Sequence, residues 1–222
     1  LENPLVAGAS SLTSHLDSIR KLEDAGAGAL IISSLFEEQI QLQRYKMDED
    51  LVMYDDWHAE MTDIFPDMDH AGPDEHLMWT QKGKEAVDIP VIASLNCINT
   101  ETWVEWAKKL EQTGVDGLEL NFFAIPVEFT QDAQAIERHQ IEVLREVATA
   151  VTIPVSVKLN PFYTSPLQLI KAMDDAGASG VVLFNRFFHP SFDIEKETSS
   201  FPFNLSTQND HRLPLRFVGL LA

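Results

Sequence analysis

The sequence predicts an α/β fold of the TIM (β/α)8 barrel type, with about six of the eight βα units present in this chain. Apolar segments of strand length alternate with amphipathic, helix-like segments, which implies parallel strands joined by right-handed crossovers. Four apolar segments end in asparagine, at Asn96, Asn121, Asn160 and Asn185. The first and third lie 64 residues apart, as do the second and fourth, so one β-α-β-α unit occurs twice. This duplication suits an eightfold barrel better than the alternative, a doubly wound sheet.

Six strands are expected, and together they form one barrel domain over residues 1–222 that is truncated at both ends. The expected strands are residues 4–9, 28–33, 90–96, 116–121, 154–160 and 180–185. Between the first two, Leu12, Leu16 and Ile19 recur at helical spacing, and Gly26 ends that helix because glycine tolerates a left-handed backbone.

Residues 36–71 form an acidic excursion from the barrel. No lysine or arginine occurs from Met47 to Gln81, and eleven acidic residues lie between Asp48 and Glu75. Its aromatic and methionine side chains suggest a cover over the barrel mouth or a subunit interface. A helix from Pro73 to about Ala86 follows, since proline fits the first helical turn.

Three helices belong to the repeated unit. A cap at Asn99 or Thr100 precedes the first, and the third ends at Gly177. Residues 186–212 are polar, rich in phenylalanine and interrupted by prolines, which predicts a loop insertion, and residues 213–222 begin another helix. The apolar faces of the three helices comprise Trp103, Trp106, Ala107 and Leu110, then Ile136, Val143, Leu144 and Val147, then Leu167 and Ile170.

Composition excludes several classes of partner. The formal net charge of −19 argues against nucleic acid and anionic membranes. No apolar run approaches the roughly 18 residues that a membrane span needs. One cysteine and no recognisable signal peptide predict a cytoplasmic protein.

Lys158 is the strongest candidate for chemistry. It lies near the carboxyl end of an apolar strand, where alternation points it into the barrel mouth. There it could hold a phosphate or the anionic N1 of a reduced flavin, or form a Schiff base. The alternative is a lysine whose ammonium group is simply solvated.

The strand-end asparagines are the next candidates, because an amide donates and accepts hydrogen bonds without carrying a charge. Asn121 and Asn185 suit the edge of a planar heterocycle, whereas Asn96 and Asn160 could instead cap the following helices. Ser33 and Ser34 could bind a phosphate or ring carbonyl, or cap a helix. Cys97 reads as a small buried side chain, and the histidines show no metal-ligand spacing, so no metal site is predicted.

These stretches together resemble the dihydroorotate dehydrogenase family of FMN-dependent barrels, and the similar pyrimidine-binding barrel of dihydropyrimidine dehydrogenase. The segments that carry the resemblance are residues 3–9, 92–97, 117–121 and 157–159, and the strand that ends at Asn185. The resemblance implies pyrimidine metabolism, hydride transfer between a dihydropyrimidine-like CH–CH group and flavin N5, and a homodimer. It also implies that FMN contacts Ala9, Ser33, Asn121, Lys158 and Phe184, and that substrate contacts Asn121 and Asn185.

Three departures from the family pattern change these expectations. Ala124 stands where the family has its cysteine or serine base, and alanine cannot accept a proton. Ile32 replaces the lysine expected at the end of the second strand, and the glycine-rich turns that hold the FMN phosphate are absent from this chain. His189 and Cys97 are the nearest candidates for a replacement base. A Schiff-base lyase using Lys158 and a pseudoenzyme are the alternative hypotheses.

Overall fold

A curled sheet of six parallel strands, paired in chain order, forms the centre of the protein. The computed structural model describes residues 1–40, 72–123, 129–185, 191–200, 207 and 209–222. The short strand β3 (Leu35–Phe36) adds a second pairing to β4, beyond the end of β2. This half-barrel confirms the predicted fold. The six strands are β1 (Val6–Ala7), β2 (Ala29–Ile31), β4 (Val91–Asn96), β5 (Gly117–Asn121), β6 (Val155–Leu159) and β7 (Gly180–Leu183).

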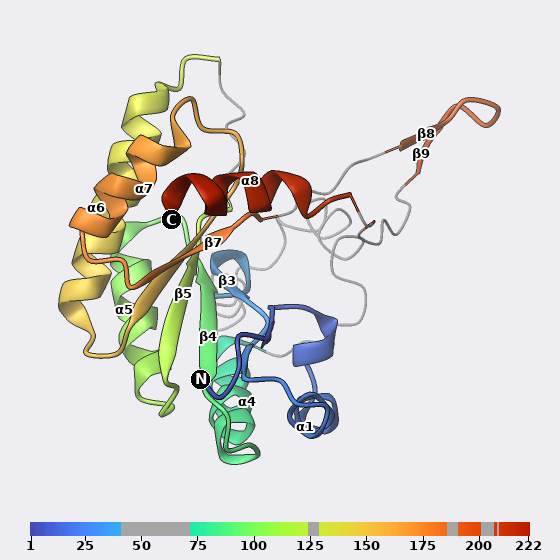
Figure 1. Ribbon diagram of the computed structural model, residues 1–222, viewed down its shortest axis with the longest axis vertical. Coiled ribbons are helices and arrows are strands. Elements are labelled where there is room, and N and C mark those ends of the chain that lie inside the picture. The colour runs from blue at the N-terminus through green and yellow to red at the C-terminus, as the bar shows by residue number, and fades with distance from the viewer. Residues whose placement is uncertain (41–71, 124–128, 186–190, 201–206, 208) are drawn as a thin grey trace, which may run out of the picture.

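Helices cover the outer side of this sheet (Figure 1). The 3-10 turn η1 (Ser11–Thr13) precedes α1, and α8 lies beside β7. Within the expected loop insertion, β8 (Ser191–Asp193) and β9 (Thr198–Ser200) form an antiparallel hairpin. Most of the acidic excursion, residues 41–71, lies outside the described residues. The helices are α1 (Leu16–Asp24), α4 (Pro73–Glu85), α5 (Thr100–Glu111), α6 (Ala133–Ala150), α7 (Pro166–Asp175) and α8 (Arg212–Leu221).

Strand register separates an apolar outer face from a polar inner face. Leu118 and Leu120 are buried in the same core cluster as Trp103 of α5 and Leu144 of α6. The residues between them therefore point to the other side of the sheet. In the register, Glu119 pairs with Ser94 on one side and Ser156 on the other, and Asn121 pairs with Lys158. These five side chains share the inner face.

Two glutamates near the carboxyl ends of helices accept hydrogen bonds from the loops that precede β4 and β6. Glu23 of α1 accepts hydrogen bonds from Asp88 N at 2.7 Å and Ile89 N at 3.1 Å, just before β4. Glu111 of α5 accepts from Thr152 N at 2.6 Å, Thr152 Oγ1 at 2.7 Å and Ile153 N at 3.3 Å, just before β6. Each loop contains an Ile-Pro pair, Ile89-Pro90 or Ile153-Pro154. The repeat seen in the sequence is therefore matched by a repeated contact between a helix-end glutamate and the backbone before a strand.

Some details of the sequence prediction are wrong. Leu12 is 61% exposed because residues 11–13 form a separate 3-10 turn, and Leu167 is 38% exposed at the start of α7. The buried face of α7 is formed by Leu169, Ile170 and Met173 instead. The side chain of Asn99 occupies the N-cap position of α5 but makes no capping bond. Its amide donates to Glu37 instead.

Candidate active site

Polar side chains at the carboxyl end of the sheet form one connected series of hydrogen bonds. Asn185 Nδ2 donates to Asn121 Oδ1 at 2.6 Å, and Asn121 Nδ2 donates to Ser34 Oγ at 3.2 Å. The oxygens of Ser34 and Ser94 lie 2.7 Å apart, and Ser94 Oγ donates to Glu119 Oε1 at 2.8 Å. Residues from four separate strand units thus meet where (β/α) barrels bind their ligands.

The strand-end asparagines do not all have the same role. Asn96 Nδ2 donates to the backbone oxygens of Asn121 at 2.7 Å and Phe123 at 3.3 Å, so it fixes the end of β5 rather than capping a helix. Asn160 Oδ1 accepts from Phe162 N at 2.8 Å, as an ordinary turn residue does. The predicted polar floor therefore consists of Asn121 and Asn185, with Asn96 behind them.

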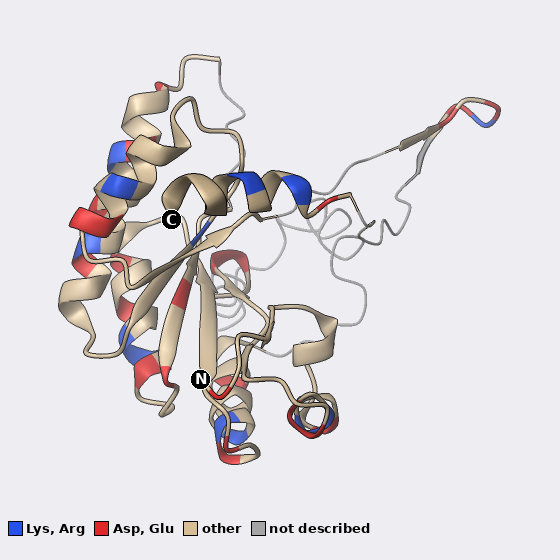
Figure 2. Cartoon of the chain, in the orientation of Figure 1, with Lys and Arg blue, Asp and Glu red and all other residues tan. Residues whose placement is uncertain are grey.

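Lys158 lies half-buried on the same inner face. Within the part of the chain that the structure describes, its ammonium group has no hydrogen-bond or ion-pair partner. Figure 2 shows charge mainly on the helices, with one acidic position on β5 and one basic position on β6, which are Glu119 and Lys158 in these strands. A half-buried cation that has no direct hydrogen-bond or ion-pair partner among these residues is suited to an anionic ligand.

Glu119 is the buried charge of this site, with only 1% of its surface exposed. Burial raises the pKa of this carboxyl, while the positive charge of Lys158 and the hydrogen bond from Ser94 pull it down in part. Glu119 and Ser94 were not among the site residues predicted from the sequence. The sequence did contain a clue to Glu119, because a charged residue within an apolar strand requires a partner. Strand alternation also places Glu119 on the same face as Asn121.

The remaining predicted residues are only partly connected to this cluster. Ser33 directly precedes Ser34 and is half-buried, and Ala9 is half-buried after β1. Phe184 packs edge-on against Phe217 of α8, with ring centroids 5.2 Å apart. Ala124 and His189 lie outside the described residues, so their placement stays a prediction.

Ile32 and Cys97, two positions that the family resemblance pointed to, do not contribute reactive groups to the inner face. The Cδ1 atom of Ile32 would lie 3.3 Å from a Cβ placed at Gly83 of α4, so this side chain faces the helices. The effect of the missing lysine on cofactor and substrate binding stays a prediction. Burial, reinforced by the carboxylates of Glu37, Glu38 and Glu105, raises the pKa of the Cys97 thiol, which disfavours a thiolate base.

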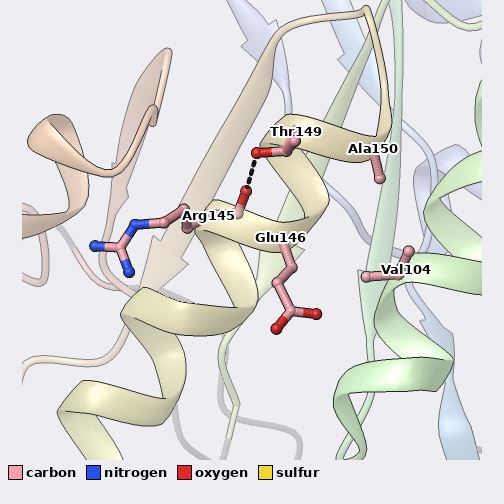
Figure 3. A pocket seen from close by; sticks show the side chains of 5 residues that line it. All are labelled: Val104, Arg145, Glu146, Thr149 and Ala150. Carbon is pink, nitrogen blue, oxygen red and sulfur yellow. Dashed lines mark hydrogen bonds between the residues drawn. The ribbon is translucent and has the colours of Figure 1, made fainter.

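A surface depression of about 360 Å³ lies elsewhere, in the helix layer between α5 and α6 (Figure 3). It contains no cluster of polar groups directed at one point, and Thr149 Oγ1 already donates to Arg145 O at 2.7 Å. We therefore place the candidate site at the inner face and not here. The depression is lined by Val104, Arg145, Glu146, Thr149 and Ala150.

Comparison with known proteins finds relatives over about half of this chain. The chain is 30% identical over 122 residues to dihydroorotate dehydrogenase A (fumarate) of Lactobacillus delbrueckii subsp. bulgaricus, which is 52% of this chain and 38% of that protein. It is 30% identical over 123 residues to the catalytic subunit of dihydroorotate dehydrogenase B (NAD(+)) of Anoxybacillus flavithermus, covering 54% and 38%. The chain is similar to dihydroorotate dehydrogenases.

The similarity covers only part of each relative's length. The matched region spans about two fifths of the curated dihydroorotate dehydrogenases, and no model of a known protein family matches the sequence. Among solved structures, 2,3-dimethylmalate lyase superposes with a TM-score of 0.51 at 15% identity, covering 82% of this chain and 58% of the lyase. That likeness concerns the barrel fold alone. No helix in the described ranges has the length and apolar character to cross a membrane.

Proposed function

We propose that this protein is an FMN-dependent oxidoreductase of the dihydroorotate dehydrogenase-like type. Its substrate is a dihydropyrimidine-like ring, and hydride passes between a CH–CH group of that ring and flavin N5. The observation that carries the proposal is the ammonium of Lys158, which has no hydrogen-bond or ion-pair partner among the described residues, beside the bonded amides of Asn121 and Asn185.

The donor set fits a flavin and a pyrimidine. Lys158 supplies a positive charge that no described carboxylate neutralises by direct contact, which suits the N1–O2 edge of a reduced isoalloxazine. Asn121 pairs with Lys158 in the strand register and accepts a hydrogen bond from Asn185, so it can contact both ring systems. Ala9, Ser33 and Phe184 would complete the cofactor contacts. Flavin supplies the hydride chemistry when bound, while these residues bind, orient and hold charge.

The amide pair also sets the orientation of the substrate. Because Asn121 Oδ1 accepts from Asn185, the carbonyl oxygen of Asn185 is directed away from that bond and can accept from a ring N–H. Its remaining amide hydrogen can donate to a neighbouring ring carbonyl. A ring with alternating N–H and C=O groups matches that arrangement.

A flavin titration tests this proposal directly. The visible absorption spectrum of the full-length protein should show flavin bands, as isolated or after FMN is added. Replacing Lys158 by methionine should weaken FMN binding roughly 10- to 100-fold, since one charge-assisted hydrogen bond contributes about 1.5–3 kcal/mol. Lys171→Met is the matched control, because Lys171 is exposed on α7 and pairs with Asp175. Equal FMN affinity in both variants would contradict the proposed site.

Two experiments on the same full-length protein distinguish the oxidoreductase from a Schiff-base lyase and from a pseudoenzyme. A Schiff-base lyase would give a borohydride-trapped adduct on Lys158 with pyruvate, and the proposed oxidoreductase would not. A pseudoenzyme would bind FMN or no ligand and would leave bound flavin oxidised with every dihydropyrimidine. Bleaching of the flavin by one such compound would support the oxidoreductase.

A further inference from the structure

Oxidation of a CH–CH group needs a proton acceptor as well as a hydride acceptor, and position 124 holds an alanine. We propose that Glu119 is the proton acceptor of this site, and that the proton reaches it through the hydroxyl groups of Ser34 and Ser94. This inference rests on the proposed function and adds the residues that would replace the missing base.

The hydrogen-bond directions support a transfer toward Glu119. Ser94 has one hydroxyl hydrogen, and it is donated to Glu119 Oε1 at 2.8 Å, so Ser34 must be the donor in the 2.7 Å contact with Ser94. Asn121 Nδ2 in turn donates to Ser34 Oγ at 3.2 Å. Every donor in the series points toward the carboxylate, so protons can shift along it without a hydroxyl rotation beforehand.

Burial increases along the same path. Ser34 is 9% exposed, Ser94 is fully buried and Glu119 is 1% exposed, while Lys158 and Asn185 at the opening are half-buried. Bulk water is thereby kept from the carboxylate, and the two serines connect it to the ligand side. Lys158, from β6, is the titratable group that acts on Glu119, and β4 contributes the uncharged Ser94. The raised pKa of the carboxyl moves it toward the range that suits a proton acceptor near neutral pH.

The proposed step balances in atoms and charge. A C–H bond of the dihydropyrimidine breaks and its proton binds Ser34 Oγ, as the Ser34 proton moves to Ser94 and the Ser94 proton moves to Glu119. The electron pair of that bond forms the ring double bond. A bound oxidised flavin would be the oxidant and would supply the hydride acceptor for the neighbouring carbon. Glu119 ends as a neutral carboxylic acid beside Lys158.

Other described groups suit this role less well. The carboxylate of Glu37 is occupied by Ile98 N at 2.5 Å, Asn99 N at 3.0 Å and Asn99 Nδ2 at 2.5 Å, where it fixes the start of α5. Cys97 has a raised thiol pKa, for the reasons given above. Glu119 is the acidic residue that the strand register places on the inner face beside Asn121.

The test uses the full-length FMN-loaded protein and rapid anaerobic mixing with dihydroorotate or 5,6-dihydrouracil. Flavin bleaching by the wild type should speed up with pH as Glu119 ionises. Glu119→Gln and Ser94→Ala should each slow bleaching at least 100-fold and remove that pH dependence, because a general base contributes about 10²–10⁴-fold. Ser94→Thr, which keeps the hydroxyl, should retain most of the rate.

Ser156→Ala is the matched control. Ser156 lies beside Glu119 on the same face, but its hydroxyl donates to Leu118 O at 3.0 Å and stands outside the series. The rate and pH profile of flavin bleaching in Ser156→Ala should match those of the wild type. Reduction of the flavin by dithionite should be equal in all variants. An infrared difference titration against Glu119→Gln gives a readout independent of turnover. The Glu119 midpoint should rise in Ser94→Ala, which loses a hydrogen bond to the charged form, and not in Ser156→Ala.

The outcomes separate the two proposals. Bleaching of the wild type with equal rates and pH profiles in Glu119→Gln, Ser94→Ala and Ser156→Ala would overturn the role of Glu119 and leave the oxidoreductase intact. A wild type that binds FMN but is bleached by neither dihydropyrimidine would overturn the proposed function, and the proton path with it. Loss of rate and of pH dependence in Glu119→Gln and Ser94→Ala, with normal Ser156→Ala, supports both.

Discussion

Replacing Glu37 by glutamine should lower the free energy of unfolding by about 3 kcal/mol. Glu37 is 1% exposed and follows β3, and it accepts three hydrogen bonds from Ile98 and Asn99 at the start of α5. The carboxylate thus holds the two residues that directly precede α5, a helix that lies some 60 residues further along the chain.

The magnitude follows from what glutamine retains. Its carbonyl oxygen can still accept from the two backbone N–H groups, but its amide would face the amide of Asn99, donor against donor. One hydrogen bond to a charged group is worth about 1.5–3 kcal/mol, and a negative charge at a partly buried helix N-terminus contributes up to about 2 kcal/mol. A protein of this size loses roughly 2–4 °C of melting temperature per kcal/mol, so the midpoint should fall by about 6–12 °C.

Urea denaturation followed by circular dichroism measures this difference. Glu38→Gln is the matched control, since Glu38 Oε2 is buried without a hydrogen-bond partner among the described residues and losing its charge removes no bond there. Its unfolding free energy should stay within about 0.5 kcal/mol of the wild type or rise. If Glu37→Gln unfolded at the same urea concentration as Glu38→Gln, the hydrogen bonds that Glu37 accepts from Ile98 and Asn99 would not stabilise the protein.

Two further predictions concern buried titratable groups. Burial lowers the pKa of His76 to about 4 from 6.5, so the stability from keeping this ring neutral is present above pH 6.5 and is lost as the pH falls toward 4. Between pH 7 and 5 the wild type should therefore lose about 2 kcal/mol more than His76→Gln does in urea titrations, and equal losses would contradict the burial. Because burial raises its pKa, Cys97 should react with a thiol reagent at pH 8 at least 100-fold more slowly in the folded protein than in urea. Rapid labelling without unfolding would show that the thiol is exposed.

Much of the architecture could be predicted because it is periodic. The Trp103 face of α5 and the Val143 face of α6 are buried as their spacing indicates, and the strands that end at Asn96 and Asn121 lie where the apolar runs predict. Short strands, which are too brief to show a repeating pattern of apolar residues, were not predicted from the sequence. The strand β3 has two residues, and the β8–β9 hairpin has three residues on each side.

The site could be predicted only in part, because sequence shows which residues lie at strand ends but not how their side chains pair. Asn121 and Asn185 are joined by a hydrogen bond, while their contacts with a ligand stay a prediction. The roles of Asn96 and Asn160 depend on backbone groups brought near by folding, which no local pattern encodes. Glu119 was visible within the Glu-Leu-Asn motif, yet its importance appears only once Ser94, 25 positions earlier, is seen to donate to it.

The paired carboxylates Glu23 and Glu111 lie at the amino ends of the strands, opposite the edge where we propose that ligand binds. The loops that they hold can therefore stay constant while the loops at the other edge change. A lineage that inherits this scaffold can change residues in the loops at the carboxyl edge without weakening the contacts between successive units. Such a separation lets new substrate preferences arise by drift at one edge while selection on foldability acts mainly at the other.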